Sequence, residues 1–488
     1  MRAWTLRRPE RKGIAGRLMR TLHWFRADLR LRDNRALAEA ARGDQCLPFF
    51  VLDDTILRSS RTGAPRVRFL LDCLKALRAS LTARGSTLLV LRGDPAVEIA
   101  RLIDATRAEL VTWGRCDTPY ARRRDARVRA VLERAGVRSF ETKDDVVFAS
   151  EEIRTARGGP YAVYTPYRNA WWARLHREPQ APRLAPHLPP SIPKVSETLG
   201  IALPSPEELD FESDAELPPG GEVAAERRLE RFLSGAVRGY AADRDLPAKD
   251  GTSRLSPYLR FGVISARSCV DAARACAEDE KSAAEGSSKW VNELIWREFY
   301  RAVLAENPRV QRGCYRREYD ALEWNDDPEA LAAWGEGRTG FPIVDAGMRQ
   351  LAATGWMHNR IRMVVASFLT KDLLLDWRLG EDFFFRGLVD GDPASNNGGW
   401  QWSASTGTDA QPYFRIFNPV SQGVKFDPEG SFVRRWVPEL EGVEDKLIHT
   451  PWELPHPPRN YPPPIVSHAE RRVAALRRFE AVRTRGGK

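Results

Sequence analysis

The spacing of hydrophobic positions divides the chain into three parts. From residue 22 to about residue 142, short apolar runs alternate with longer segments in which apolar residues recur every three or four positions. Short runs bounded by turn residues are typical of buried strands, and the longer segments are typical of amphipathic helices. Strands that alternate with helices of this length predict a Rossmann-like, parallel, five-stranded α/β sheet. The strands are expected within 22–31, 46–53, 87–93, 110–114 and 137–142.

The periodicity then fails between residues 151 and 225. Ten prolines lie between Pro179 and Pro219, which is typical of a connection that crosses a surface. After residue 226 the pattern becomes helical throughout, and no strand signal competes with it. Clear helical segments are 224–245, 290–307, 341–355, 356–377 and 468–483. We therefore expect an N-terminal arm (1–20), an α/β domain (21–150), a linker (151–225) and a larger all-helical domain (226–488).

Composition limits the classes of function. A net charge of +10 in 488 residues fits a polyanionic partner such as nucleic acid. Six scattered cysteines without CxxC spacing indicate buried thiols in a reducing compartment rather than disulfides or a metal site. No run of eighteen apolar residues is present, and the basic N-terminus lacks the apolar core of a signal peptide. We expect a cytoplasmic protein of the bacterial cytosol or nucleoid, without membrane attachment.

The stretch from Asp390 to Pro428 is unusual in composition. It is poor in charge and crowded with Gly, Asn, Ser, Thr and aromatic residues, which is not the composition of an ordinary helix. Small residues let the backbone approach a ligand closely, and Trp400 and Trp402 supply flat apolar surface. The stretch predicts a wall of a cofactor or substrate cavity, with a long surface loop as the alternative. No GxGxxG motif follows the first strand, so an NAD-type site is not supported.

Two further stretches carry candidate chemistry. Thr252 to Ser256, TSRLS, offers hydroxyls and an arginine between helices, which would suit phosphates or simply cap a helix. On a helix, Glu293, Trp296, Arg297 and Tyr300 would share one face. A carboxylate beside a stacking Trp suits recognition of a nucleobase, whereas the plainer interpretation is an exposed Glu–Arg pair.

A third stretch is Gly355 to Met363. Asn359 and Met363 would lie one helical turn apart, with Arg360 and Arg362 beside them. His358 is either a proton donor or, more commonly for a single histidine, a core residue. Trp324, Trp377 and Trp400 are far apart in sequence, and nothing in their spacing shows that they touch.

These stretches, in this order, resemble the photolyase/cryptochrome family over nearly the whole chain. The matching motifs include HWFRADLRLRDNRAL, GTSRLSPYLRFG, WVNELIWREFYR, GWMHNRIRMVVASFLTKDLLLDW and DGDPASNNGGWQWSASTGTDAQPYFRIFNP. The chain is most similar to bacterial class I cyclobutane pyrimidine dimer photolyases. That resemblance implies FAD in the helical domain, active in its reduced form, and light-driven repair of a pyrimidine dimer flipped out of DNA.

The resemblance also implies roles for individual residues. Asn396 would face flavin N5, and Arg362 would pair with Asp390. The residues implied to bind FAD are Tyr240, Thr252, Ser253, Arg254, Leu255, Ser256, Trp290, Arg362, Asp390, Gly391, Asp392 and Asn396. Those implied to act on the dimer are Glu293, Trp296, Asn359, Met363, Asn396 and Trp402. Those implied to contact DNA are Arg244, Glu293, Trp296, Arg297, Asn359, Arg360 and Gln422. Trp400, Trp377 and Trp324 would form the electron chain that photoreduces the flavin, and no metal is implied.

Single positions bear on the subfamily and on a second chromophore. Asn396 and Trp296 distinguish the chain from plant cryptochromes, and Asn359 distinguishes it from (6-4) photolyases, which have a second histidine there. Folate-binding relatives carry an Asn–Glu pair before an RxRD run, whereas this chain has Tyr120 and Ala121. Folate is therefore not supported, and the antenna is a deazaflavin, a flavin, another molecule or none.

Three functional hypotheses follow. The first is a monomeric DNA-repair enzyme, a carbon–carbon lyase acting on pyrimidine dimers in single-stranded or double-stranded DNA. The second is a blue-light sensor on the same fold, which would have no need to keep the dimer-binding residues together. The third is a basic, Trp-rich DNA-binding protein without redox chemistry, which a yellow purified protein would exclude.

Overall fold

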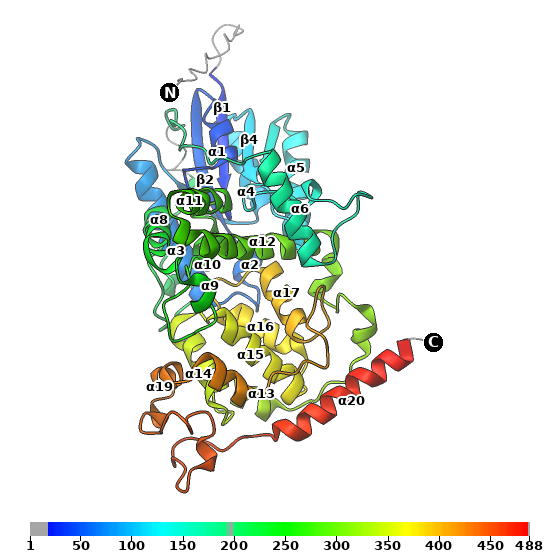
Figure 1. Cartoon of the computed structure of the whole chain (residues 1–488). Helices are drawn as coiled ribbons and strands as arrows, with labels where there is room; N and C mark the ends of the chain where they lie inside the picture. Colours follow the sequence, from blue (N-terminus) through cyan, green and yellow to red (C-terminus); the bar gives the residue numbers. More distant parts are fainter. Residues whose placement is uncertain (1–17, 193–194, 196–198, 487–488) are drawn as a thin grey trace.

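A computed structural model describes residues 18–192, 195 and 199–486 (Figure 1). The predicted N-terminal arm therefore lies, except for its last three residues, outside the described residues. Five parallel strands form one sheet, as the hydrophobic pattern predicted, and their order is β3-β2-β1-β4-β5. The strands are β1 (Arg20–Phe25), β2 (Gln45–Asp53), β3 (Leu89–Gly93), β4 (Leu110–Gly114) and β5 (Arg138–Thr142).

The central strands β2, β1 and β4 are buried on both faces, whereas the edge strand β5 is largely exposed, which explains why β2 and β4 are mostly apolar and β5 is polar. In β2, Phe49 and Val51 pack in one hydrophobic cluster with β3 and the helices α4 and α5, whereas Phe50 and Leu52 pack in a second cluster. That second cluster extends into the helices of the rest of the chain. The helices of this part are α1 (Arg35–Ala40), α2 (Asp54–Leu57), α3 (Ala64–Thr82), α4 (Pro95–Thr106) and α5 (Pro119–Arg134).

The remainder of the described chain is helical. α12 crosses the middle of the molecule, with the sheet on one side and α15, α16 and α17 on the other (Figure 1). The helices are α6 (Tyr164–Arg177), α8 (Glu222–Arg231), α9 (Tyr240–Asp243), α10 (Ser256–Phe261), α11 (Ala266–Asp279), α12 (Ala284–Glu306), α13 (Pro328–Gly335), α14 (Pro342–Thr354), α15 (Asn359–Ser367), α16 (Trp377–Gly387), α17 (Pro393–Ser403), α18 (Pro419–Phe426), α19 (Ser431–Trp436) and α20 (His468–Gly486).

Three local expectations were wrong. The segment 224–245 is not one helix, because a π-helical turn at Phe232–Ala236 separates α8 from α9. A second π-helical turn, Phe368–Asp372, ends α15 before α16 begins. The stretch 390–428 contains two helices, α17 and α18, despite its composition. Asp392 caps α17 by accepting from the N–H groups of Ala394 and Ser395, and Pro393 begins the helix without losing a bond.

The linker predicted at 151–225 also contains a helix that the sequence analysis did not predict. Tyr164, Tyr167, Trp171 and Leu175 of α6 are buried at helical spacing. The Trp171 indole N–H donates to the carboxylate of Glu298 on α12 at 2.7 Å. The helical period was present, but the surrounding prolines obscured it.

A buried ion triad joins the sheet to the helices. Arg267 on α11 donates to Asp33, which precedes α1, at 2.9 Å, and to Asp144, which follows β5, at 2.8 Å. Its guanidinium has no solvent exposure. Two carboxylates and their own hydrogen bonds satisfy the charge, as burial requires.

Within 18–192, 195 and 199–486, no helix is long and apolar enough to cross a bilayer. The same residues contain no group of three or more His, Cys, Asp or Glu side chains that would hold a metal ion.

Candidate active site

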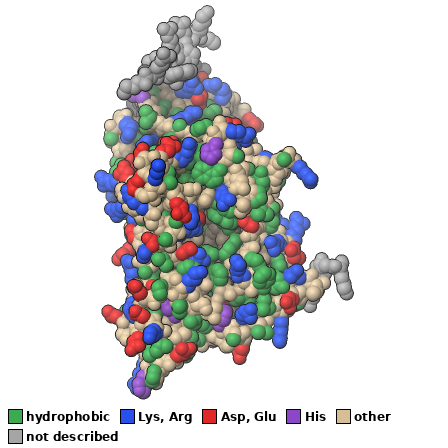
Figure 2. Space-filling model, in the orientation of Figure 1, with side chains coloured by type: hydrophobic (Ala, Val, Ile, Leu, Met, Phe, Trp, Pro, Cys, Tyr) green, Lys and Arg blue, Asp and Glu red, His purple; other side chains and the backbone are tan. Residues whose placement is uncertain are grey.

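A cavity of about 480 Å³ lies between α12, α15, α17 and the segment that precedes α10. Figure 2 shows the surface hollowed near the middle of the molecule, with basic and hydrophobic side chains around the hollow. The volume of the cavity is typical of a cofactor or substrate site. The cavity is lined by every residue implied to bind FAD, by every residue implied to act on the dimer, and by Arg244, Arg297, Arg360 and Trp400.

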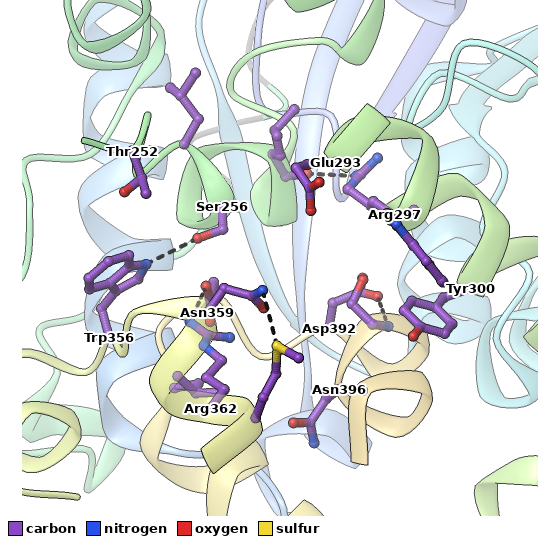
Figure 3. A pocket seen from close by; sticks show the side chains of 18 of the residues that line it. Thr252, Ser256, Glu293, Arg297, Tyr300, Trp356, Asn359, Arg362, Asp392 and Asn396 are labelled. Carbon is purple, nitrogen blue, oxygen red and sulfur yellow. Dashed lines mark hydrogen bonds and ion pairs between the residues drawn. The ribbon is translucent and has the colours of Figure 1, made fainter. Parts of the chain in front are cut away.

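The hydroxyl-rich segment 252–256 forms one wall of this cavity. The Ser253 hydroxyl accepts from the indole N–H of Trp290 at 3.1 Å, and the Ser256 hydroxyl accepts from that of Trp356 at 3.3 Å (Figure 3). Arg254 lies over the Trp356 ring, 4.9 Å from its centre. No side chain of this segment caps α10, so the capping interpretation is wrong. Hydroxyls and a guanidinium at a cavity wall suit a phosphate-containing ligand.

The predicted functional face of α12 points into the cavity. Glu293 accepts from the Arg244 guanidinium at 2.7 Å. Burial raises the pKa of Glu293, and the charge of Arg244 opposes that effect. The Trp296 ring stacks on Tyr164 of α6, with ring centres 3.6 Å apart and planes 8° from parallel. A stacked aromatic pair beside an anchored carboxylate provides a rigid platform for a planar ring.

α15 supplies the facing wall. The Asn359 amide lies 3.9 Å from the Met363 sulfur, one helical turn away (Figure 3). Arg360 pairs with Asp245 at 3.0 Å. Arg362 pairs with Asp390 at 2.8 Å, as the family resemblance implied. His358 caps α15 by accepting from the Arg360 N–H. Burial lowers the pKa of His358 to about 4, and the side chain is buried, as the core interpretation of this residue expects.

Asp392 is held by a residue that the sequence analysis missed. Arg301 lies one turn after Arg297 on α12 and donates to Asp392 at 2.6 Å. Burial alone would raise the pKa of Asp392, but the charges of Arg301, Arg260 and Arg297 together lower it to about 2. The spacing of four between Arg297 and Arg301 was the available signal, although it did not identify the partner.

Arg297 and Gln422 differ from the other residues predicted to contact DNA. The Arg297 guanidinium donates to the main-chain oxygens of Asp145 and Leu259, which leaves it embedded in the protein. Gln422 lies on α18 and is not among the residues that line the cavity. Their roles at DNA remain predictions.

The three predicted electron-transfer tryptophans belong to one hydrophobic cluster. Trp400 is buried and lines the cavity, Trp377 is fully buried, and Trp324 is only partly buried at the edge of the cluster. The Trp400 ring rests on Gly380 of α16, one turn after Trp377, where an added Cβ would lie 2.1 Å from the ring. The structure therefore places Trp377 and Trp400 in one hydrophobic cluster with Trp324 packed against it, although their sequence spacing gave no such indication.

A second cavity of about 470 Å³ lies on the sheet side of the molecule. It begins at the carboxyl ends of β1, β2 and β4 and reaches Asp392 and Arg260, which also line the first cavity. Tyr120 and Ala121 are among its lining residues. Arg124 and Arg26 lie over the Trp24 ring at 4.8 Å and 4.7 Å. Carboxyl ends of parallel strands are a common ligand position in α/β sheets.

The side chains that line the first cavity suit flavin adenine dinucleotide, independently of the sequence resemblance. Among the described residues, Asp390 Oδ1 and Trp400 Nε1 are buried polar atoms without a hydrogen-bond partner, and both residues line the cavity. Unpartnered buried polar atoms are costly unless a ligand satisfies them. Donors near segment 252–256 suit phosphates, and the aromatic walls suit a planar ring system.

Comparisons with known proteins agree with this geometry. The family described as "DNA photolyase" matches residues 21–187, and the "FAD binding domain of DNA photolyase" matches residues 290–481. The chain is 45% identical to the deoxyribodipyrimidine photo-lyase of Halobacterium salinarum, over 95% of this chain and 99% of that protein. It is 43% identical to the protein of the same name from Synechococcus, over 92% and 93% of the two chains.

Solved structures of photolyases and of a cryptochrome share the fold of this chain. A bacterial class III photolyase from Agrobacterium tumefaciens superposes with a TM-score of 0.87 at 38% identity, over 96% of this chain and 99% of that one. An archaeal photolyase from Sulfolobus tokodaii, solved with two FAD molecules, gives 0.81 at 33%, over 95% and 100%. A Synechocystis cryptochrome gives 0.85 at 27%, over 95% and 99%.

Proposed function

Since the chain belongs to the DNA photolyase family, we propose that it repairs cyclobutane pyrimidine dimers in DNA under light. The chain is a photolyase and binds FAD. The dimer as substrate, and the roles of individual residues, are our proposal. The observation that carries it is the convergence of Glu293, Trp296, Asn359, Met363 and Trp402 on the same cavity as the flavin-binding residues.

The cofactor would be held by residues from four separate elements. Segment 252–256 would hold its phosphates and Trp290 would lie against it, while Arg362 and Asp390, already paired, would fix the polar edge of the ring system. Asn396 would face flavin N5. When bound and reduced, FAD supplies the light-excited electron that opens the cyclobutane ring.

The protein's own part is to hold the extruded dimer dry and close. Trp296 and Trp402 would stack against the two pyrimidines, and the Glu293 carboxylate would accept their N–H groups. Arg244 and Arg360, each beside an acidic partner at the cavity, would contact the phosphates of the opened strand. We propose a monomer acting on single-stranded or double-stranded DNA.

The experiment is repair of a thymine-dimer oligonucleotide by the purified flavoprotein with reductant, in light and in darkness. Light-dependent loss of the dimer supports the proposal. A flavin that photoreduces without any repair would contradict it and would favour a blue-light sensor, the function suggested by the similarity to a cryptochrome. The class I assignment stays a prediction, because one similar structure is described as class III.

We further propose that the second cavity holds an antenna chromophore. Its aromatic and guanidinium lining suits a planar, electron-rich ring. Tyr120, in the position that argued against folate, donates its hydroxyl to Asp53 within this cavity. The test is an absorption band in the purified protein that flavin does not have and that disappears when the second chromophore is removed.

A further inference from the structure

One chain of side chains joins the two cavities. Arg61, in the loop between α2 and α3, lines the second cavity and pairs with Glu381 of α16 at 2.7 Å. Glu381 in turn accepts from the side-chain amide of Asn396 at 3.3 Å, and Asn396 lines the first cavity. A single buried carboxylate thus connects an arginine of the sheet part to the asparagine beside the flavin site.

These contacts fix which way the Asn396 amide points. Its NH₂ group donates to the main-chain oxygen of Glu381 at 2.8 Å as well as to the carboxylate. Both partners are acceptors, so the NH₂ group is directed at α16. The amide oxygen is the atom left to face the cavity.

This orientation is strengthened when Glu381 is ionised. The main-chain oxygen accepts from the amide whatever the charge of Glu381, but a carboxylate offers the amide only acceptors, whereas a protonated carboxyl has a donor that would compete for the amide oxygen. The Glu381 side chain is only 7% exposed, and burial favours the neutral form. The neighbouring Asp382 carries a like charge that acts in the same direction. Arg61, which also pairs with Asp382 at 2.7 Å, is the cation that opposes both effects.

We propose that Arg61 is a positioning residue that keeps Glu381 ionised and so holds the Asn396 oxygen toward the bound flavin. The inference rests on the proposed function, in which Asn396 faces flavin N5. Reduction converts that nitrogen from an acceptor to an N–H donor. An oxygen held in front of it therefore favours the reduced form, which the repair reaction requires.

The test compares R61Q with R386Q in the FAD-loaded protein. Arg386 is the matched control, because it pairs with Asp382 at 2.7 Å from the same helix as Glu381. R61Q should show the infrared C=O band of a protonated carboxyl at neutral pH, and the double variant R61Q/E381Q should lack it. Loss of the hydrogen bond should shift the flavin reduction equilibrium, measured against a reference dye, about fivefold toward the oxidised form. R61K should restore the wild-type behaviour.

The outcomes separate this inference from the proposed function. Wild-type infrared and redox behaviour in R61Q would overturn the role of Arg61. If N396A shifts the flavin equilibrium while R61Q does not, Asn396 faces the flavin and only the role of Arg61 is wrong. If N396A leaves the flavin equilibrium unchanged, the placement of Asn396 fails and the inference fails with it.

Discussion

Arg244 and Glu293, 49 residues apart in the chain, form an ion pair of 2.7 Å inside the cavity. The family resemblance implied that Arg244 contacts DNA and that Glu293 contacts both the dimer and DNA. In the structure they are a single unit, with partly exposed side chains on both sides. A substrate that takes the carboxylate must therefore share it with Arg244, or release Arg244 toward a phosphate.

Replacement of Glu293 by alanine should weaken repair while flavin binding is kept. A hydrogen bond to a charged group contributes about 1.5–3 kcal/mol, so we expect the repair rate to fall about tenfold or more. Flavin absorbance per protein and dimer loss under light measure the two effects. Loss of flavin in E293A would show that the residue supports the cofactor instead of the dimer.

Replacement of Trp324 by phenylalanine should block photoreduction but spare repair by chemically reduced enzyme. Trp324 is the most exposed of the three tryptophans and is therefore the expected exit to solvent. The matched control is W334F, because the Trp334 ring also lies close to Trp400, 6.0 Å between centres, without belonging to the predicted chain. Photoreduction that fails in W334F and persists in W324F would place the route through Trp334.

Two adjacent glycines of α17 should respond differently to alanine. At Gly398 an added Cβ would lie 2.2 Å from the Tyr300 ring, whereas at Gly399 it would meet no protein atom within 4 Å. G398A should lower the free energy of unfolding by about 1–3 kcal/mol through overpacking. Gly399 lines the cavity, so G399A should keep the fold and reduce the flavin-to-protein ratio. Urea unfolding and absorbance measure both, and full flavin content in G399A would place the ring elsewhere.

Asp392 should make stability depend on pH in the acid range. Its pKa is lowered from 3.8 to about 2, so its contribution is present above pH 3.8 and is lost as the pH falls toward 2. Linkage converts that lowering into about 2 kcal/mol. D392N keeps an N-cap acceptor and removes the charge, so it should be less stable than wild type by about this amount at pH 7.

The difference between wild type and D392N should shrink below about pH 4 in urea titrations. The control is D376N, because Asp376 caps α16 and pairs with Arg378 at 3.0 Å in a more exposed position. Surface pairs contribute about 0–1 kcal/mol, so D376N should differ little. A difference between wild type and D392N that is constant with pH would contradict the electrostatic account.

Much of the fold was predictable because its signals are local. Apolar runs located all five strands, and helical periodicity located α12, α14 and α20. α17 was not predicted as a helix, since its stability comes from the Asp392 cap and burial instead of residue propensity. Helix α6 was hidden among prolines for a related reason, as its burial depends on α12.

The contacts of the site also divide into those that a local sequence pattern predicts and those that only the fold brings together. Motifs along single helices, such as Glu293 with Trp296 or Asn359 with Met363, follow from helical spacing. The contacts of Arg301 with Asp392, and of Arg61 with Glu381, join residues 91 and 320 positions apart. No local pattern encodes which of many arginines meets which carboxylate, so these pairs needed the folded structure.

The buried triad of Arg267, Asp33 and Asp144 bears on how such enzymes can be recombined. Its two carboxylates come from the sheet part and its arginine from the helical part. A chimera that takes each part from a different relative inherits the two carboxylates from one parent and the arginine from the other. Unless both parents carry the same charged residues at these three positions, the hybrid buries an uncompensated charge, which typically costs about 3–5 kcal/mol. Crossover sites for exchanging the antenna-binding part should therefore be chosen so that all three positions come from the same parent.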